Sequence, residues 1–238
     1  MTVDRRRRWS APLRARNYRS VWSTFRTSAH PVDALDRYVR GSGEYPWTTS
    51  LRTPTGAIDL VLPHPHDVRT VNEVFHRHDY GTGRPEVVVD IGGNIGVSAA
   101  WFLSRSHIAR VHVWEPVPHN LQTLRLNVAR FGGRCVVHEA ALAPEAGTAT
   151  FLVDSVGRYS GLAEYQPGAE GKVAVQVECE AVADALRAVL EIEGRIDLVK
   201  VDTEGSEEAI VAAIPADLRA VIGEIVHEYP GGVRRIRA

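Results

Sequence analysis

The chain is poor in lysine and cysteine. Its 238 residues include two lysines, Lys172 and Lys200, so arginine supplies almost all of the positive charge. The formal net charge of −1 gives no overall attraction to nucleic acid, and we expect no nucleic-acid partner. The two cysteines, Cys135 and Cys179, have no spacing typical of a metal site or redox pair, and a reduced cytoplasmic protein is the simplest interpretation.

Long apolar runs are also missing. None approaches the roughly 20 residues that cross a bilayer, so we expect no membrane partner. Four histidines at positions 64, 66, 76 and 78 lack an acidic or cysteine partner at a fixed spacing, and we expect no metal site. The chain is long enough for one substantial α/β domain and a smaller extension.

Three segments follow from composition and periodicity. Residues 1–45 form a basic N-terminal extension, with ten arginines against three aspartates in the first 40 residues. This extension either contacts an acidic partner or carrier or is a solvated arm, and we favour the solvated arm. Residues 46–83 form a lead-in, with a hairpin predicted over 48–62 and a helix over 67–78. Residues 84–238 form the main domain.

The main domain alternates strands and helices. Apolar runs at 87–89, 111–114, 135–138, 196–201 and 221–226 predict a doubly wound, mostly parallel Rossmann-like sheet. Alternating patterns at 148–153 and 173–177 predict an antiparallel insertion. We expect helices to begin near Pro116 and at Ser206, with Ser206 as the cap.

No further strand is predicted after Tyr229, so the domain is expected to be short at its C-terminus. An edge of the sheet would then be left for the 48–62 hairpin or a partner chain to cover, and a homo-oligomer is possible.

The stretch 87–96 (VVVDIGGNIG) organises the domain. A buried strand runs into a glycine turn that opens a helix, and free N–H groups at the start of that helix are expected to face a ligand. Glu115 ends the next strand, 19 residues after Gly96, where a carboxylate can accept hydrogen bonds from both hydroxyls of a ribose. A structural glutamate at a strand end is the alternative.

The turn does not match the dinucleotide fingerprint. That fingerprint is Gly-x-Gly-x-x-Gly, and when it is aligned on Gly92 its second and third glycine positions hold Asn94 and Val97. The chain also lacks a Tyr-x-x-x-Lys pair, so an NAD(P)-dependent oxidoreductase is the weaker alternative. Two sequence signatures of methyl-transfer reactions are absent. No Asn/Asp-Pro-Pro-Tyr segment is present, which argues against base or glutamine N-methylation of the kind that uses it. Neither cysteine follows a proline, which argues against cytosine C5-methylation.

Several segments, in this order, resemble class I S-adenosylmethionine-dependent methyltransferases and, more narrowly, the FkbM family. The resemblance spans about residues 48–229, and its most specific part is the lysine-to-glutamate run at 200–207. The segments that carry it are 89–96 (VDIGGNIG), 115–120 (EPVPHN), 139–142 (EAAL) and 197–205 (DLVKVDTEG).

The resemblance implies an S-adenosylmethionine-dependent methyltransferase that O-methylates a small-molecule hydroxyl, such as that of a sugar or polyketide. It implies that Glu115 holds the ribose, that Ala141 lies near the adenine, and that Asp202 borders the sulfonium and the substrate. The residues expected to bind the cofactor are Asp90, Gly92, Gly93, Asn94, Gly96, Glu115, Ala141 and Asp202.

A hydroxyl acceptor must also lose a proton. We expect Asp202 to take part in catalysis and Glu204 or His227 to act as the base, with Glu228 a further candidate. His227 has the more suitable ordinary pKa, and strand alternation places His227 and Glu228 on opposite faces. Lys200 is expected to form a structural ion pair. A truncated, non-catalytic domain that only binds the cofactor is the remaining alternative.

Overall fold

The computed structural model describes residues 15–153, 161–165, 171–229 and 232–237. The chain forms two compact units, an N-terminal unit (1–81) and a C-terminal unit (82–238). Each unit is described by itself.

The N-terminal unit combines helices with the predicted hairpin. Its elements are α2 (Ala15–Thr27), α3 (Pro31–Arg40), β1 (Trp47–Thr53), β2 (Gly56–Leu62), α4 (Asp67–Val71) and a π-helix, η2 (Asn72–His76). β1 and β2 pair in antiparallel register, which confirms the hairpin. The helix predicted over 67–78 is shorter and changes to π geometry halfway, and His78 lies beyond it with a left-handed φ of 57°.

The C-terminal unit is built on a six-stranded sheet of order β12-β11-β10-β3-β4-β5. The strands are β3 (Val87–Ile91), β4 (Arg110–Trp114), β5 (Cys135–His138), β10 (Ile196–Val201), β11 (Ile222–Tyr229) and β12 (Gly232–Arg237). Every neighbouring pair is parallel except β11 and β12. This topology confirms the doubly wound, mostly parallel sheet.

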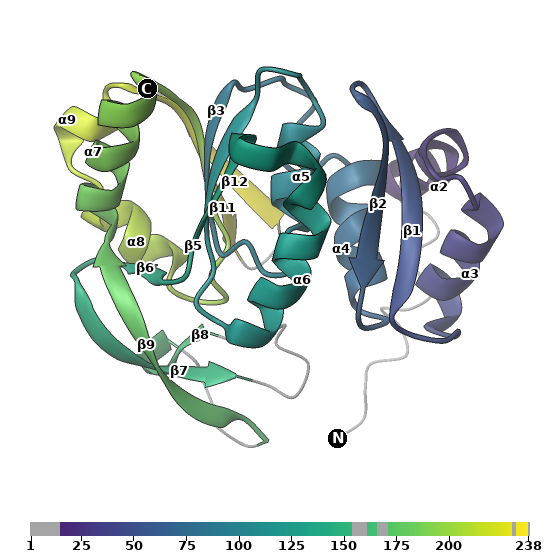
Figure 1. Cartoon of the computed structure of the whole chain (residues 1–238), viewed down its shortest axis with the longest axis horizontal. Helices are drawn as coiled ribbons and strands as arrows, with labels where there is room; N and C mark the ends of the chain where they lie inside the picture. The colour runs from purple at the N-terminus through teal and green to yellow at the C-terminus, as the bar shows by residue number, and fades with distance from the viewer. Residues whose placement is uncertain (1–14, 154–160, 166–170, 230–231, 238) are drawn as a thin grey trace. The chain divides into compact units, whose positions relative to one another are not determined.

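Helices cover both faces of this sheet. α5 (Val97–Leu103) and α6 (Pro118–Val128) lie on one face, and α7 (Val182–Glu193), α8 (Glu207–Ala213) and α9 (Ala216–Arg219) lie on the other (Figure 1). A 3₁₀ segment, η3 (Ala129–Arg134), follows α6. The chain starts at β3, runs outward to β5 and returns at β10 on the other side of β3. The β3–β10 pair is therefore the topological switch point, where doubly wound sheets bind ligands.

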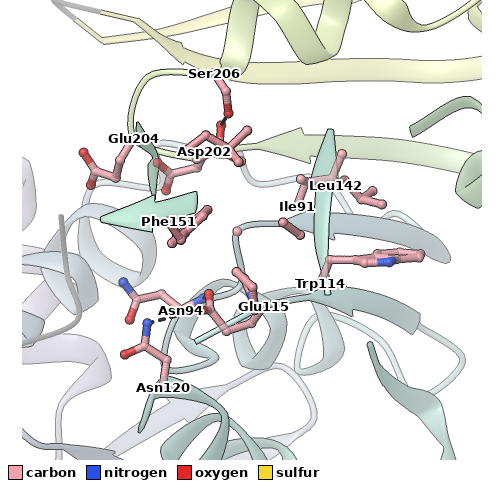
Figure 2. A pocket seen from close by; sticks show the side chains of 15 residues that line it. Ile91, Asn94, Trp114, Glu115, Asn120, Leu142, Phe151, Asp202, Glu204 and Ser206 are labelled. Atoms are coloured by element: carbon pink, nitrogen blue, oxygen red, sulfur yellow. Dashed lines mark hydrogen bonds between the residues drawn. The ribbon is translucent and has the colours of Figure 1, made fainter. Parts of the chain in front are cut away.

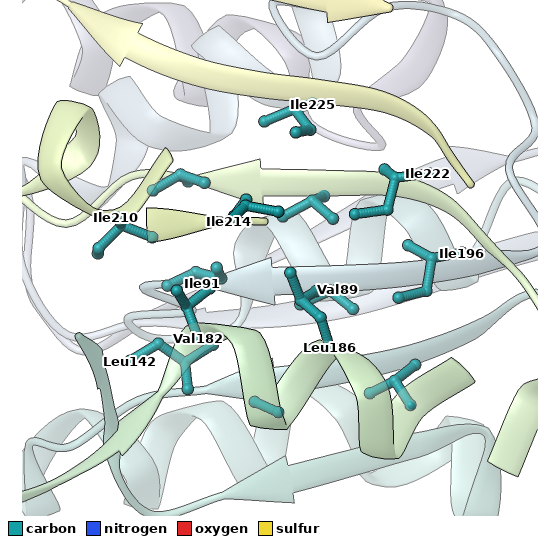
Figure 3. Packing of buried hydrophobic residues seen from close by; sticks show 14 of the residues in the cluster. Val89, Ile91, Leu142, Val182, Leu186, Ile196, Ile210, Ile214, Ile222 and Ile225 are labelled. Atoms are coloured by element: carbon teal, nitrogen blue, oxygen red, sulfur yellow. The ribbon is translucent and has the colours of Figure 1, made fainter. Parts of the chain in front are cut away.

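The core is aliphatic because strands covered on both faces need apolar residues on both sides. Figure 3 shows side chains from β3, β10 and β11 packed with those of α7 and α8. Val89, Val199 and Leu186 are fully buried there. This packing fixes the strands whose carboxyl ends build the site.

A second sheet of order β6-β9-β7-β8 is inserted between β5 and α7. It contains β6 (Ala141–Ala143), β7 (Gly147–Val153), β8 (Gly161–Leu162), a 3₁₀ turn η4 (Ala163–Tyr165) and β9 (Val173–Ala181). β7 pairs antiparallel with both β8 and β9, which confirms the predicted insertion.

The expectation of no strand after Tyr229 is wrong. β12 pairs antiparallel with β11 and covers the edge that was expected to be open. Its arginines add contacts to β11, since Arg235 and Arg237 both pair with Glu224, at 2.7 and 3.1 Å. A charged, exposed edge strand carries little hydrophobic alternation, and the sequence pattern therefore missed it.

Two predicted helix starts also need correction. α6 begins at Pro118 rather than Pro116, because Val117 is extended and donates its backbone N–H to the Glu115 carboxylate (3.0 Å). Ser206 precedes α8, but its hydroxyl donates to Thr203 Oγ1 (2.8 Å) and makes no cap hydrogen bond to the helix. The carboxylate of Glu207 accepts the N–H groups of Thr203 and Gly205 instead.

Candidate active site

A cleft lies at the carboxyl ends of β3, β4 and β10, beside the inserted sheet. It encloses about 560 Å³ of space, part of which is open to solvent. Figure 2 shows Glu115, Asn94 and Asn120 grouped on one side and Asp202 and Glu204 on the other. The lining residues are Ile91, Gly92, Asn94, Trp114, Glu115, Pro116, Asn120, Ala141, Leu142, Phe151, Leu162, Asp202, Thr203, Glu204 and Ser206.

The glycine turn is tied tightly into the sheet. The N–H groups of Gly92 and Gly93 both donate to the carbonyl of Trp114, at 3.1 and 3.0 Å. Gly92 has a left-handed φ of 77°, and a Cβ there would lie 1.9 Å from the carbonyl oxygen of Asp202. A Cβ on Gly93 would lie 2.1 Å from Val113 Cγ2. Both positions therefore require glycine.

Four N–H groups of the glycine turn are bonded within the protein. Those of Gly92 and Gly93 bind Trp114, that of Asn94 donates to Glu115 (2.8 Å), and that of Gly96 donates to Gly93 (2.8 Å). The turn thus uses these donors internally and does not offer them to a phosphate.

Glu115 is a buried carboxylate in the cleft wall. One oxygen accepts the N–H of Asn94, and the other accepts the N–H of Val117 (3.0 Å) and the side-chain amide of Asn120 (3.2 Å). Burial raises the pKa of Glu115 to about 6, against the opposing effect of these donors and of Lys200. A carboxylate has about four lone-pair sites, and the described residues donate to three of those of Glu115, which leaves one for a ligand hydroxyl.

Lys200 lies at the switch point, directly across from Asp90 in the β3–β10 register. Its ammonium group is 2.9 Å from Asp90 Oδ1, 3.6 Å from Asp202 Oδ2 and 2.8 Å from the carbonyl oxygen of Gly92. Burial would lower the pKa of Lys200, but the carboxylates of Asp90 and Asp202 outweigh it and raise that pKa to about 12. The expected structural ion pair is confirmed.

Two polar residues of the cleft have backbone conformations that non-glycine residues seldom adopt. Asn94 has a φ of 48° and Glu204 a φ of 58°, both in the left-handed region. Such conformations cluster at functional sites because the surrounding structure must hold them in place. Here the turn and the β10–α8 loop hold them at the cleft.

The rest of the wall is apolar. Ile91, Trp114, Leu142, Phe151 and Leu162 contribute it, drawn from the main sheet and the insertion. The indole of Trp114 is buried, donates to Glu180 (3.1 Å) and stacks on His138 with 3.9 Å between ring centres. A rigid flat side chain in an apolar wall suits a planar ligand group.

The structure brings most of the predicted site residues together. Gly92, Asn94, Glu115, Ala141, Asp202 and Glu204 all line the cleft. Four do not line it. Asp90 is fully buried against Lys200 and Ser98, Gly93 packs on Val113, and Gly96 precedes α5 and packs on Leu124. His227 is buried in β11, with Nδ1 3.2 Å from the carbonyl oxygen of Glu228.

Sequence reasoning missed part of the lining. Asn120 contacts Glu115 from the first turn of α6, and its place five residues after a strand-ending carboxylate was a usable signal. Phe151 and Leu162 come from the insertion, and no periodicity could indicate that they reach the cleft. Within the described part of the chain, no three His, Cys, Asp or Glu side chains are arranged to hold a metal ion. The helices of that part include none that could cross a membrane.

A model of the methyltransferase FkbM domain matches residues 90–232, more than half of the chain. The chain belongs to the FkbM methyltransferase family. The matched region begins at Asp90 and contains the rest of the glycine turn and the β10–α8 loop, so the family assignment and the cleft concern the same residues.

The individual proteins that match this FkbM protein share little sequence identity with it. The AMB antimetabolite synthetase AmbE of Pseudomonas aeruginosa is 26% identical over 190 residues, which cover 66% of this chain and 9% of that protein. The chain thus spans about a tenth of that relative's length.

Two solved structures match part of the chain at low TM-scores. A precorrin 8W decarboxylase from Methanobacterium thermoautotrophicum is 16% identical, with 61% and 54% of the two chains covered and a TM-score of 0.34. A precorrin-6y C5,15-methyltransferase from Geobacter metallireducens is 18% identical, with 59% and 51% covered and a TM-score of 0.32.

Lys200→Met should lower the free energy of unfolding by about 3–5 kcal/mol, because Asp90 would keep a buried charge without its partner. Adding Asp90→Asn removes that charge and should restore much of the loss. Urea unfolding of the single and double variants measures both effects, and Lys172→Met at the chain's other lysine is the control. A double variant as unstable as the sum of its singles would contradict this assignment.

Proposed function

We propose that the cleft binds S-adenosylmethionine and that the protein transfers its methyl group to a hydroxyl of a small molecule, of the sugar or polyketide type. One observation carries the proposal: a buried carboxylate, Glu115, lies in the cleft wall beside the glycine turn with one lone-pair site left for a ligand. A nucleoside ribose has hydroxyls that can donate to it.

The charge of the cleft supports the same ligand. Among the described lining residues are three carboxylates, Glu115, Asp202 and Glu204, and no lysine or arginine. The turn amides at 92–94 bond within the protein. A ligand with cationic groups and no phosphate fits such a site, whereas a dinucleotide would need donors for its pyrophosphate. This makes the NAD(P)-dependent alternative weaker.

S-adenosylmethionine, when bound, would supply a methyl group carried on a positively charged sulfur. In the proposed arrangement Asp202 and Glu204 stabilise that charge and orient the reacting group. Glu115 holds the ribose, and Ala141 and the apolar wall contact the adenine. Alignment of reactants in such a site can supply on the order of 7–11 kcal/mol of the rate enhancement.

The acceptor hydroxyl needs a nearby base. A new oxygen–carbon bond forms as the carbon–sulfur bond breaks, and the hydroxyl proton passes to a carboxylate. Glu204 is exposed at the cleft and Asp202 lies beside it, which favours Glu204 in this role. His227 is buried outside the lining residues, so its more suitable ordinary pKa does not compensate for its position.

The C-terminal unit holds 15 basic against 21 acidic residues, a net charge of −6, which disfavours a nucleic-acid acceptor. We keep a small molecule as the proposed acceptor. The homo-oligomer considered from the sequence was based on an open sheet edge, and β12 covers that edge.

Glu115→Gln should weaken the binding of S-adenosylhomocysteine by about tenfold or more, because the charged acceptor for the ribose hydroxyls is lost. Glu139→Gln, which alters an exposed carboxylate paired with Arg125, should bind normally. Isothermal titration calorimetry with S-adenosylhomocysteine measures the dissociation constants of both variants and of the wild type.

Binding should also depend on pH. Since hydroxyl donors favour the ionised carboxylate, binding lowers the raised pKa of Glu115, so affinity is highest above pH 6 and falls as the pH drops through 6. Glu115→Gln should remove this dependence. Equal pH profiles for the wild type and Glu115→Gln would count against the proposed role.

Glu204→Gln should slow methyl transfer by about a hundredfold or more, as expected for loss of a general base, and leave S-adenosylhomocysteine binding largely intact. The measurement is transfer of a labelled methyl group from S-adenosylmethionine to metabolites of a cell extract, followed by mass spectrometry. Glu208→Gln, exposed on α8, is the matched control. Full activity of Glu204→Gln together with an inactive His227→Ala would assign the proton to His227 instead.

A further inference from the structure

Helix α2 of the N-terminal unit packs with its polar face inward. Ser20 and Thr24 are 4% and 1% exposed, whereas Val21, Trp22 and Phe25 are 41%, 63% and 51% exposed. A surface helix of a globular protein ordinarily buries its apolar face. In this helix the large apolar side chains point away from the unit that carries them.

Hydrogen bonds hold this orientation. Ser20 Oγ donates to Asn72 Oδ1 (2.6 Å), and Thr24 Oγ1 donates to the carbonyl oxygen of Ser20 (2.9 Å). Thr27 Oγ1 lies 3.0 Å from Nδ1 of His76, which is buried in η2. The Thr24 bond lies within α2, whereas those of Ser20 and Thr27 reach η2. Buried hydroxyls are costly unless they are bonded, so the partners in η2 fix which face of α2 is turned outward.

Charge is unevenly divided along the chain. The N-terminal unit has 13 arginines, no lysine, six aspartates and two glutamates, a net charge of +5. On α2 itself, exposed Arg19 precedes the apolar residues and exposed Arg26 follows them, and the guanidinium of Arg26 is 4.5 Å from the Trp22 ring centre. Four consecutive arginines, residues 5–8, precede the helix in sequence. The near-zero net charge of the whole chain conceals this basic unit.

We propose that the outer face of α2, formed by Val21, Trp22 and Phe25 with Arg19 and Arg26, docks on an anionic lipid surface. Aromatic and aliphatic side chains insert at the boundary between headgroups and acyl chains, and the arginines contact the anionic headgroups. Such a helix lies in the interface and does not need the length of a membrane span. The inference is independent of the proposed methyl transfer, and it replaces the expectation of no membrane partner.

The extent of the patch favours lipid over a protein groove. A helix that binds in a groove presents anchors over at least two turns, at i, i+3 or i+4, and i+7. The exposed apolar residues 21, 22 and 25 cover little more than one turn. A few inserted side chains with cations beside them are sufficient for reversible attachment to a charged bilayer.

The test is co-sedimentation of the full chain with vesicles of phosphatidylcholine alone or mixed equally with phosphatidylglycerol. We expect binding to the mixed vesicles that exceeds binding to phosphatidylcholine by about tenfold and is reduced by salt. The double variant Trp22→Ser, Phe25→Ser should lose most of this binding. Its unfolding midpoint should remain close to that of the wild type, because both side chains are exposed.

Ile108→Ser combined with Ile192→Ser is the matched control, since both side chains are 62–69% exposed in the C-terminal unit. It should bind vesicles like the wild type. The double variant Arg19→Gln, Arg26→Gln should also reduce vesicle binding. The double variant Arg52→Gln, Arg187→Gln removes two exposed arginines outside α2 and should bind vesicles like the wild type. Failure of the wild type to sediment with anionic vesicles, equal binding to both compositions, or undiminished binding of the Trp22→Ser, Phe25→Ser variant would each overturn the proposal.

Discussion

The buried contact between Lys200 and Asp90 sets the geometry of the C-terminal unit. The two residues are paired across β3 and β10, the neighbouring strands at which the order of strand addition reverses. The same ammonium group reaches Asp202 and the carbonyl oxygen of Gly92. One side chain therefore joins the strand, the glycine turn and the β10–α8 loop. Since a buried charge without its partner is strongly destabilising, this group of residues is confined to one arrangement.

That arrangement determines what the cleft can bind. The glycine turn lies so close to Asp202 and Trp114 that its amides bond within the protein. What the cleft presents instead are carboxylates and an apolar wall that includes an indole. A phosphate-bearing ligand finds no cationic side chain among the described lining residues. The carboxylates and the apolar wall support the proposed binding of a cationic nucleoside, and membership of the FkbM methyltransferase family supports the same proposal.

Much of this unit could be predicted from sequence because buried parallel strands leave a strong signal. The apolar runs that became β3, β4, β5, β10 and β11 were correctly located, as were Glu115 and Asp202 just after β4 and β10. Features set by tertiary contacts were not. β12 relies on Arg235 and Arg237 pairing with Glu224 and shows no alternation. His227 looked suitable by pKa, but the sheet buries it away from the cleft. The outward apolar face of α2 depends on Ser20 meeting Asn72, 52 residues further on.

The central claim is that the cleft beside Glu115 and Asp202 receives a cationic nucleoside without phosphate. Parallel calorimetric titrations of the wild-type chain with S-adenosylmethionine and with NADPH test it most directly. We predict saturable binding of S-adenosylmethionine with one site per chain and no measurable heat from NADPH. Saturable binding of NADPH, with no binding of S-adenosylmethionine by folded protein, would contradict the account.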